Sequence, residues 1–346
     1  MRPDPIEIPA ARRAAIDALL PHLFAARSVA LSTHVNADGD GCGSEAALAL
    51  LLAQKGIEVR IVNPTPWPAM FAFLLASGIR DDTARGAAAL RDVDRLMVMD
   101  ISDVRRLGTL ADAVRALPLP PLVIDHHLPG DEPPGTIHVT DTAACATGEL
   151  VFDLAIAAGL EITPDVATAI YTAMLTDTGG FRFSNTSARC LAVASHLVAA
   201  GVEPEAMYRR IYASSSVGRI RLLAEALRTI DVDSAAGIAS VEIEAGALAR
   251  HNVIPEDLDG VAEYPRSIEG TKLALLFRDL GHGKVKVSFR SIGTVDANAI
   301  AREFGGGGHA KAAGALIEGS LAEVKANVTA AARRAVAGGQ GTQGDA

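Results

Sequence analysis

The chain has 346 residues, of which 49% are hydrophobic and 21% are charged, and its formal net charge is -9. This composition is typical of a globular protein rather than a disordered one, and the length suits two domains. The negative charge disfavours a protein that coats long nucleic acid, because such binding depends on many lysines and arginines.

The sequence predicts a cytoplasmic protein without a membrane-spanning segment. No basic cap followed by an apolar run stands at the N-terminus, so no signal peptide is expected. The longest apolar stretch, about residues 46–53, is well short of the roughly 20 residues that cross a bilayer. Cys42, Cys145 and Cys190 lie far apart without CxxC spacing, which favours a reducing compartment and disfavours a disulfide framework.

Short apolar runs alternate with helical patterns over the first part of the chain. After a first helix at about 10–26, strands are expected at 28–32, 58–62, 96–99 and 122–124, with helical stretches at 45–55, 70–76 and 109–117. The strands lack polar alternation, which indicates burial on both faces of a parallel sheet. This order predicts an α/β domain with helices on both faces of the sheet.

Helices dominate next, and a second α/β pattern follows them. The helices are expected at 148–158, 164–175, 187–200, 204–212 and 218–230. Strands at 238–243, 272–277 and 284–289 and helices at 297–303 and 322–336 predict a smaller domain with a mixed sheet. The expected organisation is a catalytic domain over 1–212, a helical linker over 213–236, a second domain over 237–337 and a disordered tail over 338–346.

The first polar motif follows the first expected strand and contains His34, Asp38 and Asp40, with glycines at 39, 41 and 43. Open α/β folds place ligands at this carboxyl edge of the sheet. The glycines would let a turn fold tightly around whatever the carboxylates bind. One alternative is a loop in which Asp or Ser caps a helix. Another is a dinucleotide-binding turn, which is disfavoured because the two aspartates would face a pyrophosphate.

Three further polar motifs follow apolar segments. Asp100 ends one expected strand, Asp125, His126 and His127 directly follow the next, and Asp177 ends an apolar helix. A single aspartate after a strand is often a helix cap, but three titratable residues in a row exceed what capping needs. An acid at the end of a helix opposes the helix dipole, so Asp177 needs another reason to be there. Imidazole with carboxylate suits manganese, iron or zinc.

Five carboxylates and three imidazoles are therefore expected to meet at one sheet edge. Acids gathered in one cleft repel one another and are driven to protonate. A pair of divalent cations about 3.5–4 Å apart removes this conflict and can hold the attacking and leaving oxygens of a phosphoryl group. The residues predict a two-metal phosphoesterase that acts on small nucleotides or very short oligonucleotides.

The order of these motifs resembles the DHH phosphoesterase superfamily, in which HxxxDxD is followed by a strand-end Asp, DHH and a further Asp. The run Gly306-Gly-Gly-His309-Ala-Lys-Ala-Ala-Gly314 is similar to the glycine-rich motif of the DHH-associated domain. The resemblance covers about residues 20–337. Length and layout are similar to those of the oligoribonucleases that also dephosphorylate 3'-phosphoadenosine 5'-phosphate.

The resemblance implies a role for each motif residue. One metal would be held by His34 and Asp38, the second by Asp40, His126 and Asp177, and both would be bridged by Asp100. His127 would touch the substrate phosphate or protonate the leaving group, and Asp125 would orient a histidine. Substrate binding would fall to Arg290 and His309, to backbone amides of Gly306, Gly307 and Gly308, and to Arg182, which lies in a Phe-Arg-Phe run typical of a strand.

The resemblance also implies the cofactors and substrates. The expected ions are two Mn²⁺, with Mg²⁺ or Co²⁺ as alternatives, and the expected substrates are a small nucleotide or short single-stranded RNA. Four alternatives stay open: a cyclic- or linear-dinucleotide phosphodiesterase, a RecJ-like exonuclease, a manganese pyrophosphatase and an inactive nucleotide-binding module. The last is disfavoured because no ligand position is lost. A homodimer is also left open.

Overall fold

The computed structural model describes residues 5–258 and 260–338, and the chain divides into two compact units after Ser214. Within those residues, no helix combines the length and the apolar character that crossing a bilayer requires. The tail predicted over 338–346 lies outside the described residues, apart from the last backbone position of a helix that ends at Gly338. Each unit is described separately below.

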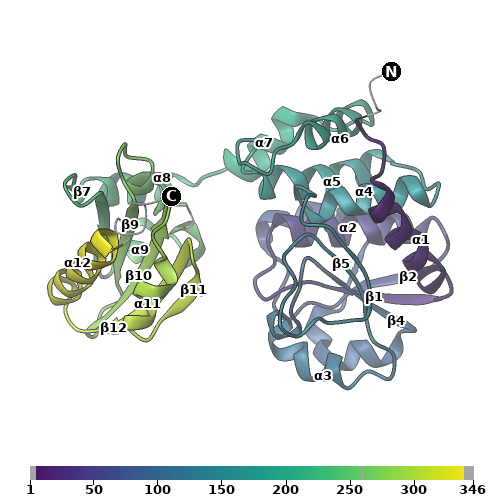
Figure 1. Cartoon of the computed structure of the whole chain (residues 1–346), viewed down its shortest axis with the longest axis horizontal. Helices are drawn as coiled ribbons and strands as arrows, with labels where there is room; N and C mark the ends of the chain where they lie inside the picture. The colour runs from purple at the N-terminus through teal and green to yellow at the C-terminus, as the bar shows by residue number, and fades with distance from the viewer. Residues whose placement is uncertain (1–4, 259, 339–346) are drawn as a thin grey trace, which may run out of the picture. The chain divides into compact units, whose positions relative to one another are not determined.

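The first unit contains a six-stranded parallel sheet, here called sheet A, with the strand order β3-β2-β1-β4-β5-β6 (Figure 1). Its strands are β1 (Ser28–Ser32), β2 (Glu58–Ile61), β3 (Arg80–Asp81), β4 (Arg95–Met99), β5 (Leu122–Asp125) and β6 (Ile137–Thr140). Its α-helices are α1 (Ala10–Phe24), α2 (Gly39–Ala53), α3 (Ala111–Arg115), α4 (Thr147–Ala157), α5 (Pro164–Asp177), α6 (Ala188–Ala199) and α7 (Pro204–Tyr212). Short 3₁₀ segments lie at Ala69–Ser77, Thr83–Asp92 and Val104–Leu110.

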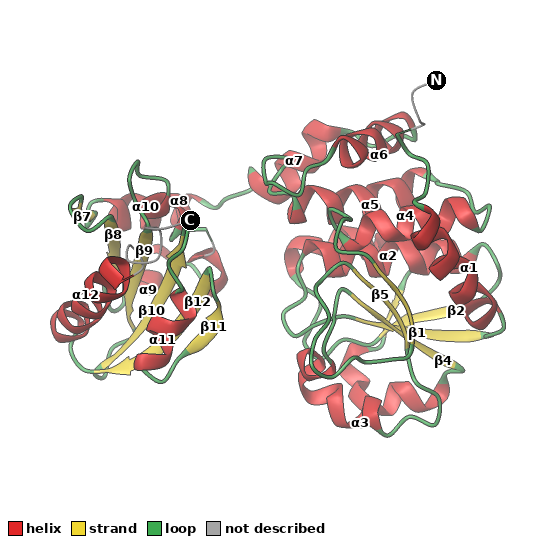
Figure 2. Ribbon diagram, in the orientation of Figure 1, coloured by secondary structure: helices red, strands yellow, loops and turns green. Residues whose placement is uncertain are grey.

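Helices cover both faces of sheet A, as Figure 2 shows. The larger apolar core packs α1, α2, α4 and α5 against one face, and a smaller core packs α3 and the neighbouring 3₁₀ segments against the other. The predicted α/β class with a parallel sheet is therefore confirmed. Two edge strands were not predicted, because β3 has only two polar residues and β6 exposes His138 in its middle.

Helix α2 begins at Gly39, six residues before the predicted start of 45. The side chain of Asp38 caps this end by accepting hydrogen bonds from the backbone N–H groups of Asp40 and Gly41 at 3.0 and 3.1 Å. The glycines thus lie in the first turns of a helix rather than in a turn that wraps a ligand. Neighbouring atoms leave no room for a side chain at these positions. A Cβ added at Gly43, for example, would lie 2.5 Å from the carbonyl oxygen of Ala169 in α5.

The second unit contains a six-stranded mixed sheet, here called sheet B, with the order β11-β12-β10-β9-β8-β7. Its strands are β7 (Asp231–Asp233), β8 (Ile238–Ile243), β9 (Leu273–Asp279), β10 (Lys284–Ser291), β11 (Gly307–His309) and β12 (Ala312–Glu318). Its helices are α8 (Val217–Leu227), α9 (Ala247–His251), α10 (Glu263–Arg266), α11 (Ala297–Glu303) and α12 (Leu321–Gly338), with a 3₁₀ turn at Pro255–Leu258. Only β8 and β9 run parallel to each other; the other pairs are antiparallel, so the predicted mixed sheet is confirmed.

Different helices cover the two faces of sheet B. The main core lies under α11 and α12, whereas α8, α9 and α10 pack against the β8–β9 side of the opposite face. Leu222 and Ala226 of α8 are buried in one cluster with Val241, so this helix packs as part of the second unit, whereas the sequence predicts a helical linker over 213–236.

The glycine run forms the edge strand β11, which pairs with β12. A Cβ added at Gly306 would clash with the carbonyl oxygen of Gly314, and one added at Gly308, where φ is +147°, would press against that of Ala312. These two glycines are therefore required by the close backbone of β12. The Cβ position of Gly307 is not crowded in this way, since its nearest neighbour would be 3.9 Å away.

A matched pair of substitutions tests this packing. Gly306→Ala should lower the free energy of unfolding of the second unit by about 1–3 kcal/mol, because an added methyl group forces the two strands apart. Gly307→Ala is the control, since its new Cβ would have Asn298 Oδ1 as nearest neighbour, 3.9 Å away. Thermal unfolding followed by circular dichroism measures both variants. Equal midpoints for the two would contradict the packing account.

Candidate metal centre

The predicted metal ligands, except Asp177 at the end of α5, lie just beyond the ends of three neighbouring strands of sheet A. The strand order changes direction between β1 and β4, and open α/β sheets bind ligands at the carboxyl ends of the strands at such a point. Asp100 directly follows β4 with φ of +60°, a left-handed conformation that costs a non-glycine residue about 1–3 kcal/mol. Its backbone N–H donates to the carbonyl oxygen of Ile124 at 2.9 Å, so β5 helps to hold it in this conformation.

Backbone carbonyl groups fix the orientation of two histidines. Nδ1 of His34 lies 3.0 Å from the carbonyl oxygen of Val35, and Nδ1 of His126 lies 3.3 Å from that of Ala144. A carbonyl oxygen only accepts, so each Nδ1 carries a proton, and the deprotonated form of each ring would have its lone pair on Nε2. Both Nε2 atoms are buried and have no hydrogen-bond partner among the described residues.

Carboxylate oxygens face the His34 nitrogen. Its Nε2 lies 3.4 Å from Oδ2 of Asp100 and 3.6 Å from Oδ2 of Asp38. The other oxygen of Asp100, Oδ1, lies 3.6 Å from Nε2 of His126. The two oxygens of one carboxylate thus face two different histidines, as a carboxylate that bridges two ions would.

A second group of ligand atoms surrounds His126. Its Nε2 lies 3.5 Å from Oδ2 of Asp40 and 3.6 Å from Oδ2 of Asp177. Asp40 is buried and is held by the backbone N–H groups of Thr147 and Gly148, which donate to its two oxygens at 2.7 and 3.0 Å. Asp177, at the end of α5, is partly exposed.

The residues fit divalent metal ions. Three sets of side chains, which share Asp100 and His126, place one ligand atom each within 4.8 Å of one another: His34, Asp38 and Asp100; Asp40, His126 and Asp177; Asp100, His126 and His127. Two buried imidazole Nε2 atoms that each face carboxylate oxygens are, once deprotonated, a donor set suited to manganese, iron or zinc.

His127 differs from the other two histidines because it is paired with an acid. Its Nδ1 lies 2.8 Å from Oδ1 of the buried Asp125. This hydrogen bond raises the pKa of His127, burial opposes the rise, and the charge of Asp100 adds to it. The ring is 39% exposed, so it can reach a molecule bound at the crevice.

Burial and crowding perturb the acids of the metal-free site. Burial raises the pKa of Asp40 well above its usual range, and the charges of Asp100 and Asp177 raise it further. Burial also raises the pKa of Asp177 to about 6, with His126 opposing and Asp100 adding to the rise. The site without cations therefore retains protons that ordinary aspartates would have lost.

Thr147 is a residue of this site that the sequence analysis missed. Its hydroxyl donates to Oδ1 of Asp100 at 3.0 Å, and its backbone N–H donates to Asp40. Asn185, also missed, donates from Nδ2 to the carbonyl oxygen of Cys145 and to Oδ2 of Asp177, at 2.9 and 3.3 Å. No charged motif marks either residue, although Thr147 opens helix α4, which follows β6.

The predicted substrate-binding residues are spread over both units. Arg182 is exposed in a turn, not in the expected strand, because Phe181 adopts φ of +62° and Thr178 accepts hydrogen bonds from this segment. Its Nε donates to the carbonyl oxygen of Gly179 at 2.6 Å. Arg290 lies on β10 of the second unit with a half-exposed side chain, and the side chain of His309 lies outside the described part of the structure.

A parallel sheet with histidines and aspartates at its carboxyl edge, followed by a mixed-sheet unit, places the chain among the hydrolytic phosphoesterases. The DHH family N-terminal domain matches residues 28–174, and the DHHA1 domain matches residues 217–338. The chain belongs to the DHH family, and the resemblance seen in its motifs is confirmed.

Relatives support this assignment. The bifunctional oligoribonuclease and PAP phosphatase NrnA of Thermus thermophilus is 33% identical over 292 residues, 84% of each chain. The Bacillus subtilis protein of that name is 26% identical, over 84% of this chain and 89% of that one. An exopolyphosphatase-related protein from Bacteroides fragilis has a TM-score of 0.87 at 27% identity and covers 95% of this chain and 98% of its own. RecJ bound to manganese shares the fold, with a TM-score of 0.54 at 17% identity over 96% of each chain.

The role of Thr147 can be tested by removing its hydroxyl alone. Thr147→Val should weaken Mn²⁺ binding about 10–100-fold, because Asp100 loses the donor that orients it. Thr147→Ser should restore affinity. Thr172→Val is the matched control, since the buried hydroxyl of Thr172 donates only to the backbone oxygen of Thr168. Titration calorimetry measures the dissociation constants, and wild-type affinity in Thr147→Val would contradict the role.

Metal binding should release protons at neutral pH. Burial lowers the pKa of His34, but the facing carboxylates of Asp100 and Asp38 outweigh it and raise the pKa from 6.5 to about 10. The folded metal-free protein then holds this proton more tightly than the unfolded chain, so its extra stability is complete below pH 6.5 and is lost as pH rises toward 10. Mn²⁺ needs the deprotonated ring, so its affinity should rise over the same range. Calorimetry in buffers of different ionisation enthalpy counts the protons; none released at pH 7.5 would contradict the expectation.

Proposed function

We propose that this chain is a divalent-metal-dependent phosphoesterase that hydrolyses short oligoribonucleotides to mononucleotides and 3'-phosphoadenosine 5'-phosphate to AMP. The observation that carries the proposal is the carboxylate of Asp100, whose two oxygens face His34 and His126. A shared acid between two nitrogen-and-oxygen ligand groups is the arrangement that a two-metal phosphoesterase requires. The substrates are those in the printed names of the Thermus and Bacillus relatives.

The ligand groups suggest how two ions would be held. His34 and Asp38 would bind one ion, Asp40, His126 and Asp177 would bind the second, and Asp100 would contact both. Divalent ions there supply activation of water and stabilisation of charge on the phosphoryl oxygens. Manganese is the preferred ion because the donors mix imidazole with carboxylate, and magnesium or cobalt are the alternatives.

His127 is the proposed proton carrier. The Asp125 carboxylate raises the pKa of His127, which favours a ring protonated on both nitrogens. With Nδ1 hydrogen-bonded to Asp125, the Nε2–H group is left to donate to the leaving oxygen or to the substrate phosphate. Asp125 acts through His127 by fixing the orientation of the ring.

The proposed phosphate contacts come from both units. In the first unit Arg182 follows Asp177 by five residues and keeps its guanidinium exposed. In the second unit Arg290 and His309 would bind the phosphate, with the backbone of Gly306, Gly307 and Gly308 beside them. Because the net charge is -9, a small anion held by metals and a few cations is better accommodated than a long strand.

A substrate panel tests the function directly. Purified protein with Mn²⁺ should hydrolyse 3'-phosphoadenosine 5'-phosphate and dinucleotides faster than 20-nucleotide RNA, and chelation should abolish both activities. Faster degradation of the long RNA would favour a RecJ-like exonuclease. Preference for a cyclic dinucleotide or for pyrophosphate would favour those phosphodiesterase or pyrophosphatase alternatives instead.

Asp100→Ala should reduce kcat at least about 1,000-fold, because both ligand groups lose their shared carboxylate and with it several kcal/mol of transition-state stabilisation. The matched control is Asp112→Ala, which removes an exposed aspartate on α3 that pairs with Arg115. Steady-state rates with saturating Mn²⁺ and an unfolding curve for each protein make the comparison. Substantial turnover by folded Asp100→Ala protein would rule out the shared-carboxylate mechanism.

A further inference from the structure

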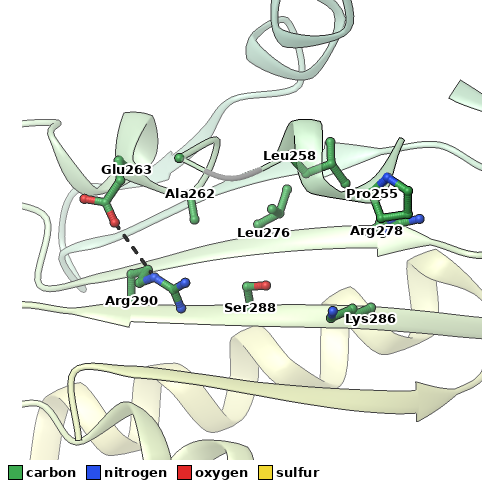
Figure 3. A pocket seen from close by; sticks show the side chains of 10 residues that line it. Pro255, Leu258, Ala262, Glu263, Leu276, Arg278, Lys286, Ser288 and Arg290 are labelled. Carbon is green, nitrogen blue, oxygen red and sulfur yellow. Dashed lines mark ion pairs between the residues drawn. The ribbon is translucent and has the colours of Figure 1, made fainter. Parts of the chain in front are cut away.

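A pocket with several charged side chains lies on the face of sheet B opposite α11 and α12. Along β10, Val285, Val287 and Phe289 point into the core, so the alternate residues Lys286, Ser288 and Arg290 line the opposite face. A cavity of about 110 Å³ lies over them, and its other side is lined by Pro255, Leu258, Gly260, Ala262 and Glu263. Figure 3 shows Arg278 and Lys286 at one end of this pocket and Arg290 beside Glu263 at the other.

Two positive charges lie opposite each other at the first end. Lys286 of β10 pairs in register with Arg278 of β9, and both side chains line the pocket. Directly opposed residues on antiparallel strands have Cβ atoms about 4.5–5.5 Å apart, and like charges in this position destabilise the sheet. Neither side chain forms an ion pair or hydrogen bond with another described side chain. A bound anion would remove this repulsion.

The other end is differently arranged. Arg290 lies 3.8 Å from Glu263, and Glu263 also pairs with Arg266, so one carboxylate is shared between two arginines. Arg290 and Lys286 are four residues apart on one strand, which separates their Cα atoms by about 13 Å. The hydroxyl of Ser288 lies between them, and Leu276 and Leu258 add apolar surface. The pocket therefore has positively charged side chains at both ends, and Ser288 and apolar residues lie between them.

We propose that Arg278 and Lys286 form a second phosphate-binding position, which takes a further phosphate of an oligonucleotide whose first phosphate lies at Arg290. The inference rests on the proposed function, because it assumes that Arg290 contacts substrate. A mononucleotide occupies one of the two positions, and only an oligonucleotide occupies both. This position selects for RNA of three or more nucleotides over 3'-phosphoadenosine 5'-phosphate and thereby sets relative rates within the substrate class.

The double variant Arg278→Gln/Lys286→Gln tests the proposal in the full chain. Fluorescence anisotropy of a labelled RNA pentanucleotide, in chelator so that no turnover occurs, should show about tenfold weaker binding and a shallower salt dependence. With Mn²⁺, KM for the pentanucleotide should rise by a similar factor at nearly constant kcat. Values for 3'-phosphoadenosine 5'-phosphate should stay within about twofold.

Lys284→Gln is the matched control, since Lys284 lies on the same strand, opposite Glu318 and outside the pocket. The double variant should melt at the same temperature as wild type or higher, because the two substitutions remove a contact between like charges. Unchanged pentanucleotide binding in the folded double variant overturns the proposal. The proposal is also overturned if the double variant binds inorganic tripolyphosphate more weakly but binds the pentanucleotide as wild type does, because this would indicate a site for free phosphate chains. If the wild-type protein hydrolyses no nucleotide, the proposed function fails. The comparison of pentanucleotide binding between wild type and the double variant still tests whether Arg278 and Lys286 bind phosphate.

Discussion

Mutual repulsion among buried carboxylates at the carboxyl edge of sheet A is the constraint on which the rest of the first unit depends. Asp40 and Asp100 are almost completely buried, and burial with neighbouring negative charge raises the pKa of Asp40. A fold gathers such acids only where cations compensate them. The parallel strand order brings β1 and β4 together, so residues more than sixty positions apart in the chain meet at one crevice.

The segment from Ala144 to Gly148 holds these acids in place. It accepts a hydrogen bond from His126, donates two to Asp40 and supplies the Thr147 hydroxyl to Asp100. Glu149 secures the segment by accepting from the Cys145 N–H at 3.0 Å, and Glu149 is itself bound by Arg12 and Arg189. Arg12 of α1 and Arg189 of α6 thus support the geometry of the candidate ligands through Glu149, without contacting those ligands themselves.

The fold class and the candidate ligand residues could be predicted from the sequence because both depend on local sequence patterns. Buried parallel strands lack polar alternation, and titratable residues at strand ends stand out. The packing reasons for two glycines could not be predicted from the sequence. Gly43 is crowded by the backbone of α5, which is distant in the chain, and Gly306 by the backbone of β12, which becomes its neighbour only once the two strands pair. Thr147 was missed for a similar cause: a threonine after a strand looks like any helix start until Asp100 is seen beside it.

The central claim is that two ions share the carboxylate of Asp100. A crystal structure of the protein soaked in Mn²⁺, with diffraction recorded at the manganese absorption edge, measures it most directly. The account predicts two anomalous peaks, one beside His34 and Asp38 and the other beside Asp40, His126 and Asp177, with an Asp100 oxygen bound to each. A single peak, or two peaks that do not share Asp100, would contradict it.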